Sequence, residues 1–193
     1  MECALDLLGT EGWHATTVRA ICTRARLTPR YFYESFADRD AVLLAVFDEI
    51  SAEGAGVAVA ALEEAPHDAR AKSRAAIGAF IEFVTEDPRK ARVLFVEAMG
   101  SERLARRRFE MLRVFARLVA EQARIFYGMP QASDPLIETT ALMLVGGLAE
   151  ALLAWRDGTL EVTREQLIED CTDLFVAAGE ASARLVRARA DNR

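Results

Sequence analysis

The segment from Trp13 to Phe36 constrains the fold of this chain most, because it predicts two short helices joined by a very tight corner. Thr16 and Thr17 can cap a helix that begins near Val18, since a hydroxyl at a helix N-terminus accepts from backbone N–H groups that the first turn leaves unpaired. The apolar side chains that follow at helical spacing form one face: Val18, Ile21, Cys22 and Ala25.

The second helix is predicted to begin at Pro29, directly after a possible cap at Thr28. Proline suits the first helical position, because its missing N–H removes no helix bond and its fixed φ matches the turn. Between the two helices lie only Arg26 and Leu27, so their axes must cross steeply. This is the geometry of a helix-turn-helix whose second helix can enter a major groove.

The second helix also separates two kinds of side chain. Phe32 and Phe36, four residues apart, face a small core, whereas Arg30, Tyr31 and Glu34 point elsewhere. Five arginines oppose three acidic residues between positions 13 and 40, although the whole chain has a net charge of −6. Phosphate binding requires only local positive charge. By charge alone these arginines indicate a solvated helix surface; the caps, the corner and the aromatic pattern favour DNA contact.

The stretch EGWHATTVRAICTRARLTPRYFYESFADRDAVLLAVF resembles the N-terminal DNA-binding domain of the TetR (tetracycline repressor type) family of transcriptional regulators. The matching residues agree in order and spacing: Gly12, Trp13, Thr16, Thr17, Ile21, Ala25, Tyr33 and Phe36. The resemblance implies an all-α fold of about nine helices. Residues 1–47 would form a three-helix helix-turn-helix head for DNA binding, and residues 48–193 a larger helical body for ligand binding and dimerisation.

The resemblance implies two groups of DNA-contacting residues. Thr28, Arg30 and Tyr31 correspond to the groove-facing start of the recognition helix, and Thr17, Tyr33 and Arg39 to positions where backbone phosphates are held. The chemistry agrees, since Arg30 can fork onto a guanine edge and the hydroxyls of Thr17 and Tyr33 can donate to phosphate oxygens. A half-buried packing role for Tyr33 is compatible with this placement.

Three features depart from the family pattern. Arg26 stands where glycine is common, and a non-glycine residue resists positive φ. Glu34 brings a negative charge near the phosphate path, where it can repel phosphate or accept from a cytosine amine. The first helix, over residues 1–9, is short and lacks a preceding basic arm, so we expect a truncated start and weaker DNA binding.

Beyond Phe36 nearly every segment predicts helix, with proline and glycine at the borders. The expected helices cover residues 38–65, 68–85, 88–100, 101–127, 135–156 and 163–189, and a loop covers 128–135. Aromatic and methionine side chains of these helices could line an apolar ligand cavity, or be core only: Phe80, Phe83, Phe95, Met99, Met111, Phe115, Phe126 and Met143. Glu97 could meet a cationic or hydroxylated ligand there, although an ion pair with Arg92 is the favoured interpretation.

The last two expected helices carry apolar side chains around more than one face. We therefore predict that they meet a second copy of the chain as a four-helix bundle. The expected interface residues are Leu148, Leu152, Trp155, Leu167, Cys171, Leu174 and Phe175. A buried core helix in a monomer is the alternative. A two-fold dimer would present two recognition helices to a palindromic operator.

Other classes of function find less support. The three cysteines, Cys3, Cys22 and Cys171, lack the spacing of a disulfide framework or zinc site. His14 and His67 lack a recognisable catalytic partner pattern, and no nucleotide-binding motif is present. We therefore expect no enzyme, cofactor or metal. No apolar run long enough for a membrane span and no signal peptide are evident, so we expect a cytoplasmic protein without a membrane partner.

The sequence thus predicts a TetR-like DNA-binding transcriptional regulator. We expect it to be a homodimeric repressor, released from a double-stranded palindromic operator by a small-molecule effector. The alternative is a helical interaction or dimerisation protein with weak or lost DNA binding.

Overall fold

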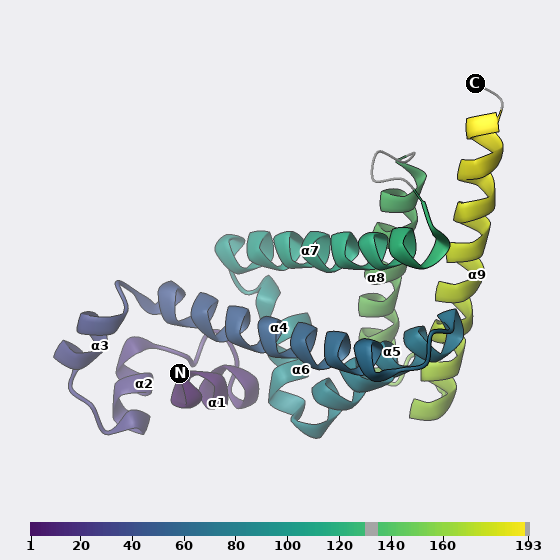
Figure 1. The fold of residues 1–193 in the computed structure, drawn as a ribbon. Coiled ribbons are helices and arrows are strands. Elements are labelled where there is room, and N and C mark those ends of the chain that lie inside the picture. Colours follow the sequence, from purple (N-terminus) through teal and green to yellow (C-terminus); the bar gives the residue numbers. More distant parts are fainter. Residues whose placement is uncertain (130–134, 192–193) are drawn as a thin grey trace. The chain divides into compact units, whose positions relative to one another are not determined.

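The computed structural model describes residues 1–129 and 135–191, and in these ranges all regular secondary structure is helical (Figure 1). The elements are α1 (Glu2–Thr10), α2 (Val18–Ala25), α3 (Pro29–Ser35), α4 (Arg39–Glu64), α5 (Ala69–Glu86), α6 (Pro88–Phe95), the 3₁₀ turn η1 (Glu97–Met99), α7 (Glu102–Tyr127), α8 (Leu136–Arg156) and α9 (Arg164–Asp191). The predicted all-α fold with an N-terminal helix-turn-helix is confirmed.

The helix starts follow the side chains that can cap them. The Thr17 hydroxyl accepts from the backbone N–H of Ala20 at 3.1 Å, and the Asp38 carboxylate accepts from that of Ala41 at 2.7 Å. The expected cap at Thr28 is wrong: this residue occupies the N-cap position of α3, but its side chain makes no capping bond. Pro29 starts the helix instead, through its fixed φ.

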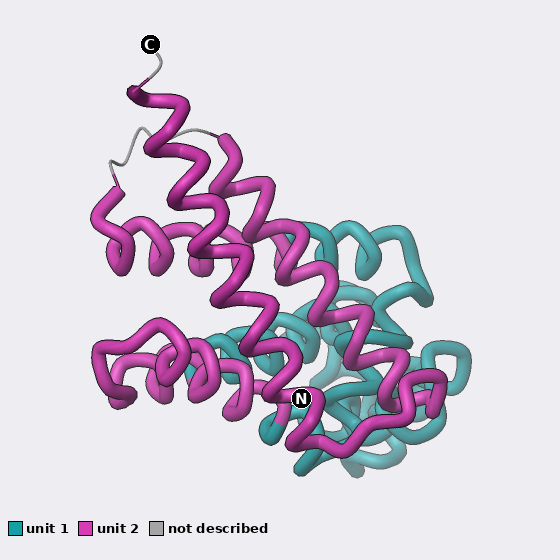
Figure 2. The backbone as a smooth tube through the Cα atoms, turned by 90° about the vertical axis from the view of Figure 1, so that its right-hand side faces the viewer, with its two compact units in different colours: residues 1–56, 82–110 teal, residues 57–81, 111–193 magenta. Residues whose placement is uncertain are grey.

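The chain divides into two compact units, shown in Figure 2. The first unit contains residues 1–56 and 82–110, and the second contains residues 57–81 and 111–193. The helix-turn-helix therefore shares its unit with α6, η1 and the start of α7. The predicted boundary after residue 47 stays a prediction.

The core of the first unit combines side chains that are distant in the sequence. Each of these residues is at most 1% exposed: Leu8, Leu43, Phe47, Val93 and Leu104. Burying one such side chain contributes roughly 1.5–3 kcal/mol. Helices α1 and α6 approach so closely that a Cβ on Gly9 would lie 2.4 Å from the Cβ of Arg89. A larger residue at position 9 would separate the two helices.

The second unit is organised around α8 and α9, which lie side by side and antiparallel (Figure 1). Their turn contains Gly158 at φ +81°, and the indole N–H of Trp155 donates to the Val162 carbonyl at 2.8 Å. Small residues of α7 pack against both helices in one buried cluster: Ala116, Ala120, Ile137, Ala141 and Val186. The hydroxyls of Thr140 and Ser182, 2.6 Å apart, join α8 to α9.

Helix α8 leaves much of its apolar surface uncovered. Its most apolar 18-residue window has a mean hydropathy of 1.6, and only 28% of that window is buried. Among the described helices it alone is long and apolar enough to cross a membrane, which corrects the sequence expectation that no run reaches that length. Leu142 and Met143 are 48% and 72% exposed. The helix therefore presents an apolar face that this chain does not bury.

Candidate nucleic-acid interface

The corner between α2 and α3 is made by a residue in the left-handed backbone conformation. Arg26 has φ 55° and ψ 38°, and it is the one non-glycine residue with positive φ in the part of the chain that the structure describes. The next N–H, from Leu27, donates to the Cys22 carbonyl at 2.9 Å and closes the end of α2. The departure at position 26 therefore leaves the turn geometry intact, at a cost of about 1–2 kcal/mol.

The recognition helix α3 is anchored by one side chain and exposes its neighbours. Phe32 is 5% exposed, and its ring lies 5.7 Å from that of Phe36 and 5.4 Å from that of Tyr33. Tyr31 and Tyr33 are 57% and 58% exposed. Tyr33 is thus exposed, not half-buried, and its ring stands nearly perpendicular to that of Phe32.

Arg30 and Glu34 form an ion pair along α3. The Arg30 Nε lies 3.3 Å from a Glu34 carboxylate oxygen, and the Arg30 side chain is 86% exposed. Such an exposed pair contributes only about 0.3–0.5 kcal/mol. Because the contact uses Nε, the two terminal nitrogens of Arg30 can still fork onto a guanine edge. Glu34 therefore has a partner within the helix and does not oppose phosphate as an isolated charge.

Two of the three residues predicted to hold phosphates, Thr17 and Arg39, lie at helix starts, whereas Tyr33 lies within α3. The Thr17 oxygen accepts the Ala20 N–H, so its own hydroxyl proton can be donated outward to a phosphate oxygen. Arg39, the first residue of α4, is 32% exposed in its side chain, and its guanidinium carbon lies 4.1 Å from the centre of the Trp13 ring. Its Nε is 3.6 Å from Asp40.

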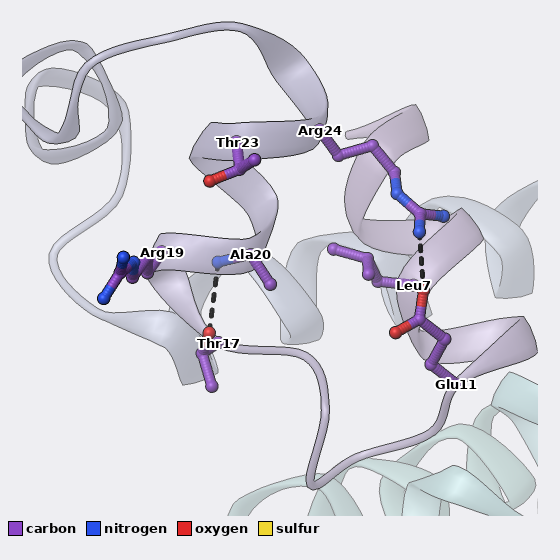
Figure 3. A pocket seen from close by; sticks show the side chains of 7 residues that line it. All are labelled: Leu7, Glu11, Thr17, Arg19, Ala20, Thr23 and Arg24. Carbon is purple, nitrogen blue, oxygen red and sulfur yellow. Dashed lines mark hydrogen bonds and ion pairs between the residues drawn. The ribbon is translucent and has the colours of Figure 1, made fainter.

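A shallow pocket is lined by residues of α1, of α2 and of the connection between them (Figure 3). Its lining residues are Leu7, Glu11, Thr17, Arg19, Ala20, Thr23 and Arg24. Arg24 donates hydrogen bonds to the carboxylates of Asp6 and of Glu11, the latter at 2.5 Å. The pKa of this guanidinium is raised, mainly by the hydrogen bond to Asp6. Arg19 lies across the pocket from that ion pair (Figure 3) and is exposed. The sequence did not single out Arg19, although this residue directly follows the predicted helix start at Val18.

The side chains predicted to line a ligand cavity are divided between the units. Phe83, Phe95, Glu97 and Met99 belong to the first, and Phe80, Met111, Phe115, Phe126 and Met143 to the second. Within the second unit the rings of Phe80 and Phe115 are 5.9 Å apart, whereas Met143 points outward from α8 and is 72% exposed. Glu97 is bonded to Arg92, the structural role favoured from the sequence. The cavity itself stays a prediction.

The predicted dimer residues fall into two groups. Leu152, Leu167 and Cys171 are buried within the chain itself, and burial is the main cause that raises the pKa of the Cys171 thiol. Leu174 is 64% exposed, and Leu148, Trp155 and Phe175 are partly exposed. Three exposed apolar residues of α8 and α9 were not among the predicted dimer contacts: Leu142, Met143 and Leu185. Helical spacing places Leu185 eleven residues, or about three turns, after Leu174.

A short, well-anchored recognition helix after a left-handed corner, with hydroxyls and arginines around it, defines a helix-turn-helix DNA-binding protein. Residues 1–46 match the family described as bacterial regulatory proteins, tetR family. Residues 1–46 therefore form a DNA-binding domain of the TetR type, and the chain is a DNA-binding transcriptional regulator.

Solved structures with the same fold cover nearly the whole chain. The fatty acid degradation regulator FadR from Bacillus halodurans is 20% identical, with a TM-score of 0.75 over 90% of this chain and 91% of that one. A putative transcriptional regulator from Pseudomonas aeruginosa PAO1 is 18% identical, with a TM-score of 0.77 over 96% and 90%. FadR from Bacillus subtilis, solved with stearoyl-CoA, is 16% identical, with a TM-score of 0.74 over 92% and 96%. No match was found among curated protein sequences.

Proposed function

We propose that this regulator is a homodimeric repressor that binds a palindromic operator and leaves it when a small molecule binds the helical body. The observation that carries the proposal is the exposure of α3, where Arg30 and Tyr31 project from a helix held by buried Phe32. Residues 1–47 act as the DNA-binding domain and residues 48–193 as the ligand-binding and dimerisation domain. The protein works in the cytoplasm and is not an enzyme.

Base reading and phosphate binding are divided between two sets of residues. Thr28, Arg30 and Tyr31 contact base edges, whereas Thr17, Tyr33 and Arg39 hold the backbone. Support comes from the exposure of Arg30, Tyr31 and Tyr33. It also comes from the Thr17 hydroxyl, whose oxygen accepts the capping bond and whose proton can still be donated to a phosphate.

Dimerisation uses the outward faces of α8 and α9. The exposed apolar side chains there are Leu142, Met143, Leu174 and Leu185. Gly146 and Gly147 have open space where a Cβ would stand, so a second helix can approach the backbone of α8 closely. Apolar exposure of this kind in one chain is typical of a surface that a partner covers.

The effector is an apolar small molecule. Support comes from the aromatic and methionine side chains of α5 and α7, of which Phe80 and Phe115 are in ring contact. Stearoyl-CoA, present in the Bacillus subtilis FadR structure, is the first compound to test, with free stearate and coenzyme A as separate controls.

The test is fluorescence anisotropy with a labelled duplex from the region upstream of the protein's own gene. The proposal expects binding that is tighter than to a shuffled duplex and that weakens when the effector is added. If neither this chain nor an N-terminally extended form prefers its upstream DNA, the regulator described here is wrong. If the chain forms dimers but binds no DNA, the alternative of a helical interaction protein is favoured.

A further inference from the structure

A buried carboxylate of the first unit holds the connection between α1 and α2. Glu97, in η1, is 8% exposed, and both of its oxygens accept hydrogen bonds. One accepts the backbone N–H of Trp13 at 2.7 Å, and the other accepts the Nε–H of Arg92 at 2.8 Å. Arg92 in turn donates to the carbonyl of Thr10 at 2.8 Å. The residues just before the helix-turn-helix are therefore bonded to a segment more than eighty positions later.

Two glycines allow this contact to be so close. A Cβ on Gly100 would lie 2.7 Å from Cγ of Trp13, so the indole packs directly on the backbone that follows η1. A Cβ on Gly12 would lie 2.8 Å from a terminal nitrogen of Arg92, and Gly12 has φ +88°. Trp13 is 8% exposed as a result. The position of the Trp13 ring therefore depends on the positions of η1 and Gly100.

The same indole ring also carries Arg39. The guanidinium carbon is 4.1 Å from the ring centre, which is the geometry of a cation–π contact. Stacking restricts the rotamers of a long side chain, while 32% of the Arg39 side-chain surface stays exposed. Within described residues the chain of contacts runs from Glu97 to Trp13 and from Trp13 to Arg39.

We infer that Glu97 and Gly100 are positioning residues for the phosphate-binding Arg39, acting through Trp13. The inference rests on the proposed function, because it takes Arg39 as a ligand of the DNA backbone. DNA affinity then depends on the placement of η1, a segment outside the helix-turn-helix sequence. A displacement of η1 removes the acceptor for the Trp13 N–H and the surface under the indole, and Arg39 loses its fixed orientation.

The test is a double-mutant cycle between Glu97→Gln and Arg39→Ala, measured on binding to a short random-sequence duplex at low salt. Random DNA is suitable because a phosphate contact carries no sequence information. Glutamine keeps the size of Glu97 but turns one acceptor into a donor, so one of the two bonds is lost. We expect Glu97→Gln to weaken binding about threefold to tenfold in the presence of Arg39. In the Arg39→Ala background the loss should be below about twofold.

A second readout separates positioning from general damage. Each phosphate contact that is removed lowers the steepness of log affinity against log salt by about 0.9, so a dimer bound through both copies of Arg39 loses twice that amount. Arg39→Ala should show this change, Glu97→Gln should show part of it, and the double variant should show no more than Arg39→Ala. Asp48→Asn is the matched control, because it removes a carboxylate that pairs with Arg107 in the same unit, remote in sequence from Trp13. It should leave the slope unchanged.

Trp13→Leu tests the same path if Glu97→Gln does not fold. Leucine keeps the backbone N–H and much of the apolar volume but removes the π face under Arg39, so its effect should also vanish in the Arg39→Ala background. Equal losses in both backgrounds, for either variant, would overturn the inference and leave the proposed function intact. Failure of the wild-type chain to bind any duplex would instead overturn the proposed function.

Discussion

Helix α3 and the outer face of α8 are both exposed, but they expose different chemistry. Helix α3 presents Arg30 and Tyr31, which can form hydrogen bonds in a groove, and it buries its one large apolar anchor, Phe32. Helix α8 presents Leu142 and Met143 next to glycines that have open space around them. Exposed polar groups are stable in water without a partner, whereas exposed apolar surface is stabilised by being covered. This difference is the basis for proposing a DNA-binding surface on α3 and a dimer surface on α8.

The largest effect is expected from placing a charged side chain on the apolar face of α8. Met143→Glu should convert dimers to monomers, because a carboxylate would have to be buried in the interface without a partner. Operator affinity should fall roughly a hundredfold, since two linked half-site contacts become one. Analytical ultracentrifugation gives the mass, and anisotropy gives the affinity.

Phe109→Glu is the control for that experiment, because Phe109 is an exposed apolar residue of α7, 50% exposed, in the first unit. It should leave the dimer intact. A dimer that survives Met143→Glu would remove the assignment of the α8 face.

The polar helix is tested by Arg30→Ala. Loss of a fork onto a guanine should weaken binding to the upstream duplex by about 1–3 kcal/mol and binding to random DNA by much less. Arg106→Ala is a closely matched control, since Arg106 pairs with Glu102 four residues away, also at 3.3 Å, on α7. Equal losses on both duplexes for Arg30→Ala would show that this residue reads no base.

Two glycines stand in environments of opposite kind, one closely packed and one open. Gly100→Ala should lower the free energy of unfolding by about 1–3 kcal/mol, because its methyl would overlap the Trp13 ring. Gly56→Ala, in α4 with open space around it, should raise that free energy by about 0.5–1 kcal/mol. Urea titrations measure both. Similar effects of the two variants would mean that Gly100 is not closely packed in solution.

The smallest expected effect is at the corner before α3. Arg26→Gly should stabilise the fold by up to about 1 kcal/mol, because glycine adopts positive φ without the steric cost that arginine has there. Arg117→Gly, in the exposed interior of α7, should destabilise by a similar amount, since glycine is a poor helix former. Thermal unfolding compares the two. Destabilisation by Arg26→Gly would mean that the arginine side chain itself stabilises the turn.

Much of the helical pattern could be predicted, because helix ends depend on nearby residues. The starts of α2 and α4 follow from Thr17 and Asp38, whose side chains bond to N–H groups three residues later. Thr28 shows the limit of such reasoning, since a capping residue before Pro29 has the right type but makes no bond. The exposure of Tyr33 could not be predicted either, because it depends on how α3 lies against the rest of its unit.

The helices, the two-residue corner and the place of Arg30 in the first turn of α3 follow from the sequence alone, because each depends on residues within about four positions. The tertiary structure decided which apolar residues of α8 remain uncovered, where Glu97 finds its partners, and that Arg39 lies on the Trp13 ring. Burial and the pairing of a buried carboxylate depend on segments that meet only after folding, and Trp13 and Glu97 are 84 positions apart in the chain. The type of a side chain limits which groups it can bind, and the tertiary structure determines which of these groups lie near it.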